Sequence, residues 1–357
     1  MVVLTPIEPS KIGGIERLIT ELGKRLASHY DLHIICSGES ERKYQDGPLD
    51  VTVVKGYTSL HIAPKIRKAV EKEQASLVYV HNYNTYMPYI AWKIKKVSRK
   101  TKVVLHAHYH PIAMTWYKTI LKWIYDPLVG SRVVRESDAI IANSQSELGE
   151  IKSKFRISNH TAVLYNGIDL ERIRSSPPKE TETGTIPLLW VGRFETYKNP
   201  FLALEVLKNL GKEYHLFFVG TGPLEAEMKA SIVKGGLQER AHLIGRVSDQ
   251  ELYEWYKAAQ CFLHFSSLES FGMTCIEALA AGTPVVANED GYGLSETIHL
   301  FPDYIKSCNI KSDGPKEIAR LVDQTSQMKP VSVNLDKFSW DSISAQLEHL
   351  LDNVLAS

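Results

Sequence analysis

Residues 263–287, LHFSSLESFGMTCIEALAAGTPVVA, contain one complete unit of a parallel α/β fold. The apolar residues at its start predict a strand that ends near Phe265. A polar loop follows, and Phe271 to Thr274 begin a helix that ends at Gly282. A second strand is expected directly afterwards. A strand, a helix and a further strand in this order are typical of a parallel sheet.

The same alternation extends in both directions along the chain. Short β-branched or apolar runs predict strands at residues 2–4, 33–36, 51–54, 77–80, 103–105, 139–142, 188–191, 215–219 and 241–244. Stretches with helical spacing of apolar residues occur at 15–28, 200–210, 248–259 and 340–355. This rhythm indicates the α/β class, with two doubly wound, Rossmann-like domains that face a cleft.

A polar segment without an apolar face, residues 175–185 (SSPPKETETGT), interrupts the pattern. We therefore expect an N-terminal domain at 1–172, a linker at 173–185 and a second domain at 186–338. A chain of 357 residues is long enough for two such domains. The final segment, 339–357, keeps apolar residues at helical spacing and is expected to form a helix, and the family resemblance described below implies that this helix packs back on the first domain.

The composition is that of an ordinary soluble protein, with 44% hydrophobic and 23% charged residues. The first ten residues do not resemble a secretory signal, and no run of about 18 apolar residues is present. The four cysteines lack the spacing of a metal knuckle, so free thiols in a reducing compartment are expected. These features favour a cytoplasmic protein.

The charges divide unevenly along the chain. Up to residue 170 there are 24 Lys and Arg against 16 Asp and Glu, and the remainder has 18 against 25. The basic residues Lys93, Lys95, Lys96, Arg99, Lys100 and Lys102, together with the aromatic and lysine-rich stretch 114–125, favour a peripheral contact of the N-terminal domain with the anionic inner face of the cell membrane. A solvated helix face is the alternative. Nucleic acid is not expected, because the net charge is only +1 and no stacking platform is evident.

The quoted stretch also carries candidate chemistry. Free N–H groups at a helix start attract phosphate oxygens, and Gly272 would allow a ligand to approach the backbone closely. Glu277 follows less than one turn after Thr274, within reach of the ribose hydroxyls of a nucleotide seated there. Glu269 lies upstream in the loop, where a sugar beyond the diphosphate would be.

A second candidate site follows the strand at 188–191. Arg193 and Lys198 are expected at the carboxyl end of this strand, where two cations could hold a diphosphate leaving group without a metal. Solvated surface charges are the alternative. Gly222, in a glycine loop after the strand at 215–219, begins another strand–loop–helix turn. Glu225 stands where a dinucleotide fingerprint needs its third glycine, which argues against an NAD domain.

The segment from Glu269 to Glu277, with its Ser-Phe-Gly insert and the following EALAAGTPVV, resembles the E-x7-E motif of the retaining glycosyltransferases of family 4, also called glycosyl transferases group 1. The resemblance implies the two-domain GT-B fold and a donor site in the C-terminal half. It implies Arg193 and Lys198 on the donor diphosphate and Glu269 at the sugar. Residues implied to bind the donor are Gly13, Gly14, Gly222, Phe271, Gly272, Met273, Thr274 and Glu277. No cofactor and no metal are implied.

The segment VVLHAHYHP, residues 103–111, allows several interpretations. On a continuous strand, His106, His108 and His110 would share one face. The family resemblance implies that His108 lies beside the donor sugar as a catalytic residue. Histidines separated by one residue at a strand end are also typical zinc or iron ligands. Plain packing is a third possibility.

Together these features lead to the expectation of a metal-independent hexosyltransferase. It would move a hexose from a UDP- or GDP-sugar to a hydroxyl of a glycan or lipid-linked acceptor, in polysaccharide or glycolipid biosynthesis. The alternatives at this point are a metal-dependent hydrolase built on His106 and His108, a sugar-nucleotide epimerase or phosphorylase of the same fold, and a non-catalytic nucleotide-sugar binding protein. The acceptor, the donor base and the sugar do not follow from the sequence.

Overall fold

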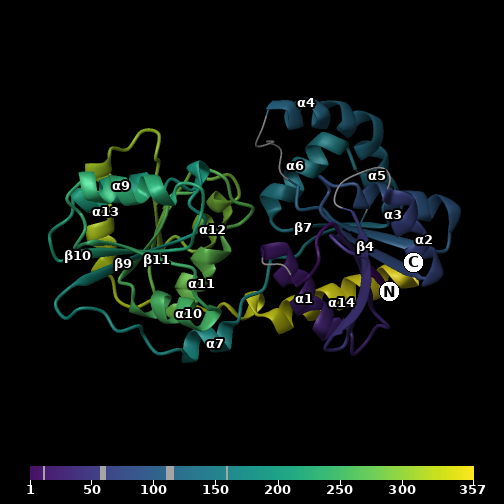
Figure 1. The fold of residues 1–357 in the computed structure, drawn as a ribbon, viewed down its shortest axis with the longest axis horizontal. Coiled ribbons are helices and arrows are strands. Elements are labelled where there is room, and N and C mark those ends of the chain that lie inside the picture. Colours follow the sequence, from purple (N-terminus) through teal and green to yellow (C-terminus); the bar gives the residue numbers. More distant parts are fainter. Residues whose placement is uncertain (11–12, 57–61, 110–115, 158–159) are drawn as a thin grey trace. The chain divides into compact units, whose positions relative to one another are not determined.

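The computed structural model describes residues 1–10, 13–56, 62–109, 116–157 and 160–357. The chain divides into two compact units, each with its own sheet. Unit 1 consists of Met1–Gly167 and Trp340–Ser357, and unit 2 consists of Ile168–Ser339. The predicted α/β class with two doubly wound domains is confirmed (Figure 1).

The sheet of unit 1 has eight strands, and each is parallel to its neighbours except the antiparallel edge strand β3. The first edge strand has the sequence RKYQD, which lacks a buried alternation, so the sequence pattern did not predict it. The spatial order is β3 (Arg42–Asp46), β4 (Leu49–Lys55), β2 (His33–Gly38), β1 (Val2–Thr5), β5 (Leu77–His81), β6 (Lys102–His106), β7 (Ala139–Ala142) and β8 (His160–Val163).

Helices cover both faces of this sheet. One face packs against α1 (Gly14–Leu26) and the C-terminal helix α14 (Trp340–Ala356). The other packs against α2 (Ala63–Lys72), α3 (Met87–Val97), α5 (Ser131–Glu136) and α6 (Gln145–Phe155). Helix α4 (Trp116–Tyr125) continues into the π-helix η1 (Asp126–Gly130).

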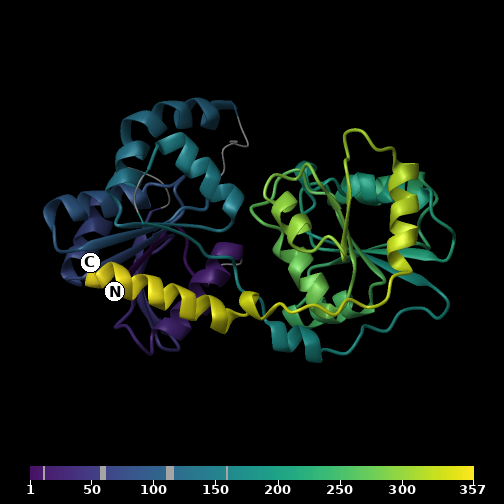
Figure 2. The same ribbon diagram turned by 180° about the vertical axis from the view of Figure 1, so that it is seen from behind.

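Helix α14 belongs to unit 1 although it is the last element of the chain. Its apolar residues Ile343, Leu347 and Leu351 are fully buried in the same core as the apolar residues of α1. Tyr30 also donates a hydrogen bond to Asp352 at 2.6 Å. The yellow helix lies beside α1 in both ribbon views (Figures 1 and 2).

The sheet of unit 2 has six strands, all parallel. Numbered by position along the chain, they stand in the order 3-2-1-4-5-6 of dinucleotide-binding folds, with the switch point between β9 and β12. Their order is β11 (Ala241–Gly245), β10 (Tyr214–Val219), β9 (Ile186–Val191), β12 (Cys261–His264), β13 (Val285–Asn288) and β14 (Ile305–Cys308).

The helices of unit 2 form two layers around this sheet (Figure 1). The layer on one face consists of α8 (Pro200–Lys208), α9 (Glu225–Lys234) and α13 (Pro315–Ser326). The other consists of α7 (Leu170–Ser175), α10 (Asp249–Ala258) and α11 (Met273–Ala281). Helix α12 (Leu294–Leu300) packs near β13 and β14, and two short 3-10 turns occur at Thr196–Lys198 and Asp336–Phe338.

The unit boundary lies between Gly167 and Ile168, earlier in the chain than the segment 173–185 expected as a linker. Within that segment, Lys179 donates from its backbone N–H to Glu254 of α10 at 2.9 Å, and its ammonium lies 3.0 Å from Glu251. The polar, proline-containing stretch is therefore a surface loop of unit 2. The two segments that link the units run side by side, because Ile168 pairs with Ser339 and Gly167 packs on Trp340.

Among the described residues, no helix combines the length and the apolar character needed to cross a bilayer. The four cysteines are buried and free.

Candidate functional site

The first group of candidate residues lies at the carboxyl ends of β9 and β12, the neighbouring strands at the switch point of unit 2. The loop after β9 carries Arg193 and Lys198, and the loop after β12 carries Glu269. Parallel strands bring these two loops to the same edge of the sheet. Asn199 joins them, since its side-chain amide donates to the Phe265 carbonyl at 2.9 Å and to the Ser267 hydroxyl at 2.8 Å.

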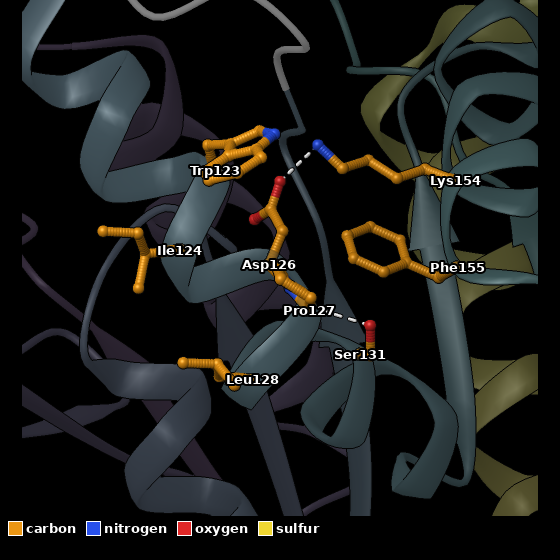
Figure 3. A pocket seen from close by; sticks show the side chains of 8 residues that line it. All are labelled: Trp123, Ile124, Asp126, Pro127, Leu128, Ser131, Lys154 and Phe155. Atoms are coloured by element: carbon orange, nitrogen blue, oxygen red, sulfur yellow. Dashed lines mark hydrogen bonds and ion pairs between the residues drawn. The ribbon is translucent and has the colours of Figure 1, made fainter.

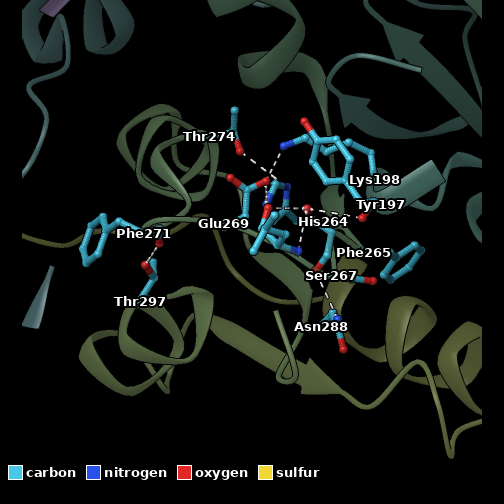
Figure 4. A network of polar contacts seen from close by, with 12 residues as sticks. Tyr197, Lys198, His264, Phe265, Ser267, Glu269, Phe271, Thr274, Asn288 and Thr297 are labelled. Carbon is cyan, nitrogen blue, oxygen red and sulfur yellow. Dashed lines mark hydrogen bonds and ion pairs between the residues drawn. The ribbon is translucent and has the colours of Figure 1, made fainter. Parts of the chain in front are cut away.

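Glu269 and Lys198 form a salt bridge at the centre of this edge (Figure 4). Both side chains are mostly buried, with 16% and 17% of their surface exposed for Lys198 and Glu269. Burial acts to raise the pKa of the Glu269 carboxyl, but the contact with His264 and the charge of Lys198 outweigh it and lower the pKa to about 2. Glu269 is therefore an anion held against a cation.

His264 is the third member of this group, and the sequence analysis did not single it out. Its Nε2 lies 3.2 Å from the Glu269 carboxylate, and its Nδ1 lies 3.4 Å from the Thr274 hydroxyl (Figure 4). The ring is buried at the end of β12. His264 thus connects the loop carboxylate to the first turn of α11.

Helix α11 begins directly beside this group, as the sequence predicted. Gly272 precedes it in a left-handed conformation, with φ of 87°, and a Cβ there would lie 2.5 Å from Leu294. Met273 and Thr274 form the first turn, which contains no acidic residue. The Phe271 side chain is buried and packs against Phe338, with 5.7 Å between the ring centroids. This contact anchors the loop before α11. The helix start presents N–H groups without a competing carboxylate.

Glu277 lies one turn further along α11. Its carboxylate accepts a hydrogen bond from the buried Tyr256 hydroxyl at 3.1 Å, which fixes one of its oxygens. Tyr256 comes from α10 and was not predicted as part of the site. The two glutamates therefore have different partners. Glu269 contacts Lys198 and His264, whereas Glu277 accepts from the Tyr256 hydroxyl.

The two remaining candidates of unit 2 occupy the adjacent loops. Arg193 is 73% exposed and pairs with Glu195 at 2.9 Å, so the structure does not bring it into the Lys198–Glu269 pair. Gly222 lies in the loop after β10, which is tied to the loop after β9 because Phe194 donates to the Thr221 carbonyl at 3.1 Å.

The second group of candidates lies at the carboxyl edge of the sheet in unit 1. His106 is the last residue of β6, but His108 has φ of 44°, a left-handed conformation that ends the strand alternation. The expectation that residues 106, 108 and 110 share one strand face is therefore wrong beyond His106, and His110 lies outside the described residues.

A buried cluster replaces the expected strand face. His81 at the end of β5, His106 and His108 lie together, with ring centroids 4.2 Å apart for His106 and His108 and 5.5 Å apart for His81 and His108. Burial lowers the pKa of His106 to about 3 and lowers the pKa of His81 well below its ordinary value, so both rings are neutral at physiological pH.

Asn143 and Glu147 complete the cluster from the end of β7 and the start of α6. The Asn143 side chain contacts His106 and His108, each at 3.0 Å, and Glu147 accepts from Asn143 and from the backbone of Tyr109. The sequence pattern predicted the strand at 139–142 but did not mark Asn143 or Glu147 as part of a site. The Ser144-x-x-Glu147 spacing is the signature of a helix capping box, which would have marked Glu147 as a structural residue.

Three ring nitrogens of this cluster, one from each histidine, lie within 4.8 Å of one another, so the cluster is a conceivable metal site. Five of its six ring nitrogens already take part in hydrogen bonds. Tyr79 and Asn143 engage the two nitrogens of His106, Asn143 also engages His108, and His108 and His81 bond to each other. A metal ion would have to displace them. The hydrogen bonds account for the cluster more fully than a ligand set does.

The glycine pair of unit 1 lies at the start of α1. The Glu16 carboxylate lies over Gly13, where a Cβ would be 2.0 Å from its oxygen. No described heavy atom lies within 4 Å of a Cβ placed on Gly14. The two glycines therefore differ, one covered by a flexible side chain and the other open.

Two Rossmann-like units with a charged site at the switch point of the second are the arrangement expected of a GT-B glycosyltransferase. A model described as "Glycosyl transferases group 1" matches residues 171–337, and one described as "Glycosyltransferase Family 4" matches residues 12–172. The chain belongs to the group 1 glycosyltransferases.

Solved structures and relatives agree with this assignment. Sucrose-phosphate synthase from Thermosynechococcus elongatus has a TM-score of 0.75 at 17% identity, covering 99% of this chain and 98% of the other. Anabaena Alr3699/HepE in complex with UDP has the same TM-score and identity, covering 99% of each chain. An N-acetylgalactosaminyltransferase of Campylobacter jejuni, whose name specifies a diphospho-undecaprenol-linked acceptor, is 26% identical over 305 residues, 82% of this chain and 80% of the relative. A GDP-mannose:cellobiosyl-diphosphopolyprenol α-mannosyltransferase of Xanthomonas campestris is 24% identical over 282 residues, 75% and 66% of the two chains.

Proposed function

We propose that this glycosyltransferase moves a hexose from a UDP- or GDP-sugar to a hydroxyl of a glycan or lipid-linked acceptor, with retention of configuration. The observation that carries the proposal is the group of Lys198, Glu269 and His264 beside the open start of α11. It combines a cation for a diphosphate, free N–H groups for phosphate oxygens and a carboxylate for sugar hydroxyls. The relatives that act on diphospho-lipid acceptors support the acceptor class.

In the proposed mechanism, Lys198 and the N–H groups at Gly272 to Thr274 stabilise the negative charge that develops on the departing nucleoside diphosphate. Arg193 is 73% exposed, and in this scheme its guanidinium leaves Glu195 to bind a phosphate. The diphosphate of the donor would bind the Lys198 ammonium in place of Glu269. The Glu269 carboxylate would then accept hydrogen bonds from the hydroxyls of the donor sugar. Glu277 holds the ribose, with its position set by Tyr256.

The acceptor hydroxyl attacks the anomeric carbon from the face that the diphosphate leaves, and the leaving phosphate oxygen takes its proton. A new glycosidic C–O bond forms as the C–O bond to the diphosphate breaks. His108, Gly13 and Gly14 would contact the donor from unit 1. No side chain forms a covalent bond, so catalysis rests on positioning and electrostatics. In this scheme the diphosphate is neutralised by protein cations and amides, with no metal required.

Thermal unfolding with UDP, GDP and their sugar conjugates, each with and without a chelator, tests the proposal. A donor at 100 times its dissociation constant stabilises the native state by about 2.7 kcal/mol, which is a readable shift. We expect a shift with one base only, unchanged by chelator. Product formation that requires an acceptor then separates a transferase from an epimerase. Loss of stability from chelator, with no nucleotide effect, would instead favour the hydrolase.

We further propose that this enzyme is cytoplasmic and that it contacts the membrane peripherally through α4 and η1. Trp123 is 78% exposed, Leu128 61% and Ile120 50%, an unusual concentration of apolar surface. Trp123 and Leu128 line a cavity of about 500 Å³ together with Phe155 and the paired side chains of Asp126 and Lys154 (Figure 3). An aromatic and aliphatic surface with adjacent lysines suits the interface of an anionic bilayer.

The basic residues of α3 contribute less to this contact than the sequence suggested. Lys95 pairs with Asp138 at 2.5 Å and Lys96 with Glu136 at 2.6 Å, so their charges are partly compensated.

Flotation with anionic vesicles checks the membrane proposal. We expect salt-sensitive binding that Trp123→Ser weakens. Val233→Ser is the matched control, because Val233 is 62% exposed on α9 of unit 2. Equal binding by both variants, or no binding by the unmodified protein, would remove the proposal.

A further inference from the structure

The buried cluster of unit 1 is a directed hydrogen-bond chain, and its direction follows from one carboxylate. Three N–H groups point at Glu147, which is 1% exposed: the backbone of Tyr109 at 2.6 Å, the backbone of Asn143 at 2.8 Å and the Asn143 side chain at 2.9 Å. Burial raises the pKa of Glu147, whereas the N–H donors from Tyr109 and Asn143 act to lower it and supply a backbone donor to each of its two oxygens. We take the group as a carboxylate, which only accepts hydrogen bonds. The side-chain atom of Asn143 that faces Glu147 is therefore the NH2 group and not the carbonyl oxygen.

This orientation fixes the proton on each neighbouring histidine. The second N–H of the Asn143 amide points at His108 Nδ1, 3.0 Å away, so Nδ1 is an acceptor and the ring proton is on Nε2. The Asn143 oxygen faces His106 Nε2 at 3.0 Å, so that nitrogen carries a proton too. His106 Nδ1 then accepts from the Tyr79 hydroxyl at 2.7 Å.

The chain continues from His108 to His81. The proton on His108 Nε2 is donated to His81 Nδ1 at 3.2 Å, which places the remaining proton of His81 on its Nε2. That atom is fully buried and has no hydrogen-bond partner among the described residues. An unpartnered buried donor is costly, so the direction of the chain is imposed by Glu147 at the other end.

We infer that Glu147 and Asn143 are positioning residues that hold His108 with its proton on Nε2, so that this histidine can offer a substrate only a hydrogen-bond donor. The inference rests on the proposed function in one respect, that His108 faces the donor sugar. His108 would then donate a hydrogen bond from Nε2–H to a lone pair of a sugar oxygen. The His108 Nε2–H would exchange its weak 3.2 Å contact with His81 for such an oxygen.

The test has an arm that is independent of activity. Long-range ¹H–¹⁵N correlation of histidine rings in the full chain reports which ring nitrogen carries the proton, and single His→Gln variants assign His81, His106 and His108. We expect all three to be protonated on Nε2. Asn143→Asp replaces the NH2 group by a carboxyl oxygen beside Glu147, so the two buried acids will share one proton. With that proton on Glu147, the new oxygen is an acceptor and we expect the proton of His108 to move to Nδ1.

Turnover measured on the same proteins completes the test. We expect Asn143→Asp to lower kcat by about tenfold or more while the donor KM changes less than twofold, because a wrongly protonated histidine costs rate rather than binding. Asn143→Ala, which leaves His108 Nδ1 without a fixed donor, serves if the Asp variant does not fold. It should give a mixture of both tautomers and a smaller loss in kcat.

Tyr79→Phe is the matched control, because it removes a hydrogen bond from the His106 side of the chain and leaves the neighbours of His108 in place. It should change neither the His108 tautomer nor the rate. A wild-type His108 protonated on Nδ1, or unchanged tautomer and kcat in both Asn143 variants, would overturn the inference. If the tautomers are as expected but no nucleotide sugar is turned over, the proposed function fails and the positioning assignment stands.

Discussion

The carboxyl edges of the two sheets carry opposite kinds of polar group. In unit 2 the edge holds charges, with the pKa of Glu269 lowered to about 2 against Lys198. In unit 1 it holds neutral rings, with the pKa of His106 lowered to about 3 by burial. We therefore expect one edge to meet charge that arrives with a ligand, and the other to fix directions of hydrogen bonding before any ligand arrives. The following experiments test this division.

Lys198→Ala should have the largest effect. Loss of a group that stabilises developing charge lowers kcat by about 10²- to 10³-fold, or about 2.7–4 kcal/mol. Product formation at saturating donor measures it. Lys208→Ala is the control, because Lys208 on α8 pairs with Glu205 of the same helix, away from the Lys198–Glu269 pair. Near-normal turnover in Lys198→Ala would show that the charged edge does not act on the leaving group.

Gly222→Ala should come next and should act on stability. A Cβ on Gly222 would lie 2.5 Å from the Phe194 nitrogen and 2.7 Å from its oxygen, so backbone would have to move. Overpacking of this kind costs about 1–3 kcal/mol of unfolding free energy. Urea denaturation measures it. Unchanged stability would indicate that the loops after β9 and β10 are less tightly joined than their hydrogen bonds suggest.

Gly14→Ala in unit 1 should leave the stability of the protein intact, in contrast to Gly222→Ala in unit 2. The added methyl group would meet no atom of the described residues within 4 Å, and Gly14 is the first residue of α1, where alanine fits without strain. We expect equal or higher stability together with weaker donor binding, measured by the ligand-induced thermal shift. Unaltered donor binding would remove the glycine pair from the donor site and leave only the charged edge.

Acid should distinguish the edges through Glu269. Its pKa is lower in the folded protein than its ordinary value of 4.5, so the unfolded chain binds more protons at intermediate pH. The stability that the carboxylate contributes is complete above about pH 4.5 and is lost as the pH falls towards 2. The difference in urea midpoint between the wild type and Glu269→Gln should therefore be constant near neutrality and shrink below pH 4.5. A constant difference down to pH 3 would contradict the depressed pKa.

Sequence reasoning succeeded where the site is local. Glu269, Gly272 and Glu277 lie within one strand–loop–helix unit, so their spacing alone predicted the start of α11 and the residues around it. The salt bridge between Lys198 and Glu269 needed one further step, that β9 and β12 are adjacent. The sheet order follows from pairing and cannot be read from periodicity.

The cluster of unit 1 could not be predicted in the same way. His81, His108 and Asn143 come from the ends of three strands, and only the parallel pairing of β5, β6 and β7 brings them together. The strand pattern was extended through His108 because nothing in the sequence marks its positive φ. Tyr256 and His264 were missed because each looks like an ordinary core residue of its helix or strand.

The place of α14 has a consequence for how the protein is made on the ribosome. Unit 1 needs Ile343, Leu347 and Leu351 to complete one face of its core, but these residues are translated after the whole of unit 2. At about 5–20 residues per second, the N-terminal segment waits roughly 10–40 s for its last helix. Unit 2 is continuous and can finish first, so nascent unit 1 exposes the apolar groove for α14 during synthesis. A chaperone that binds emerging chains would find its longest-lived target there.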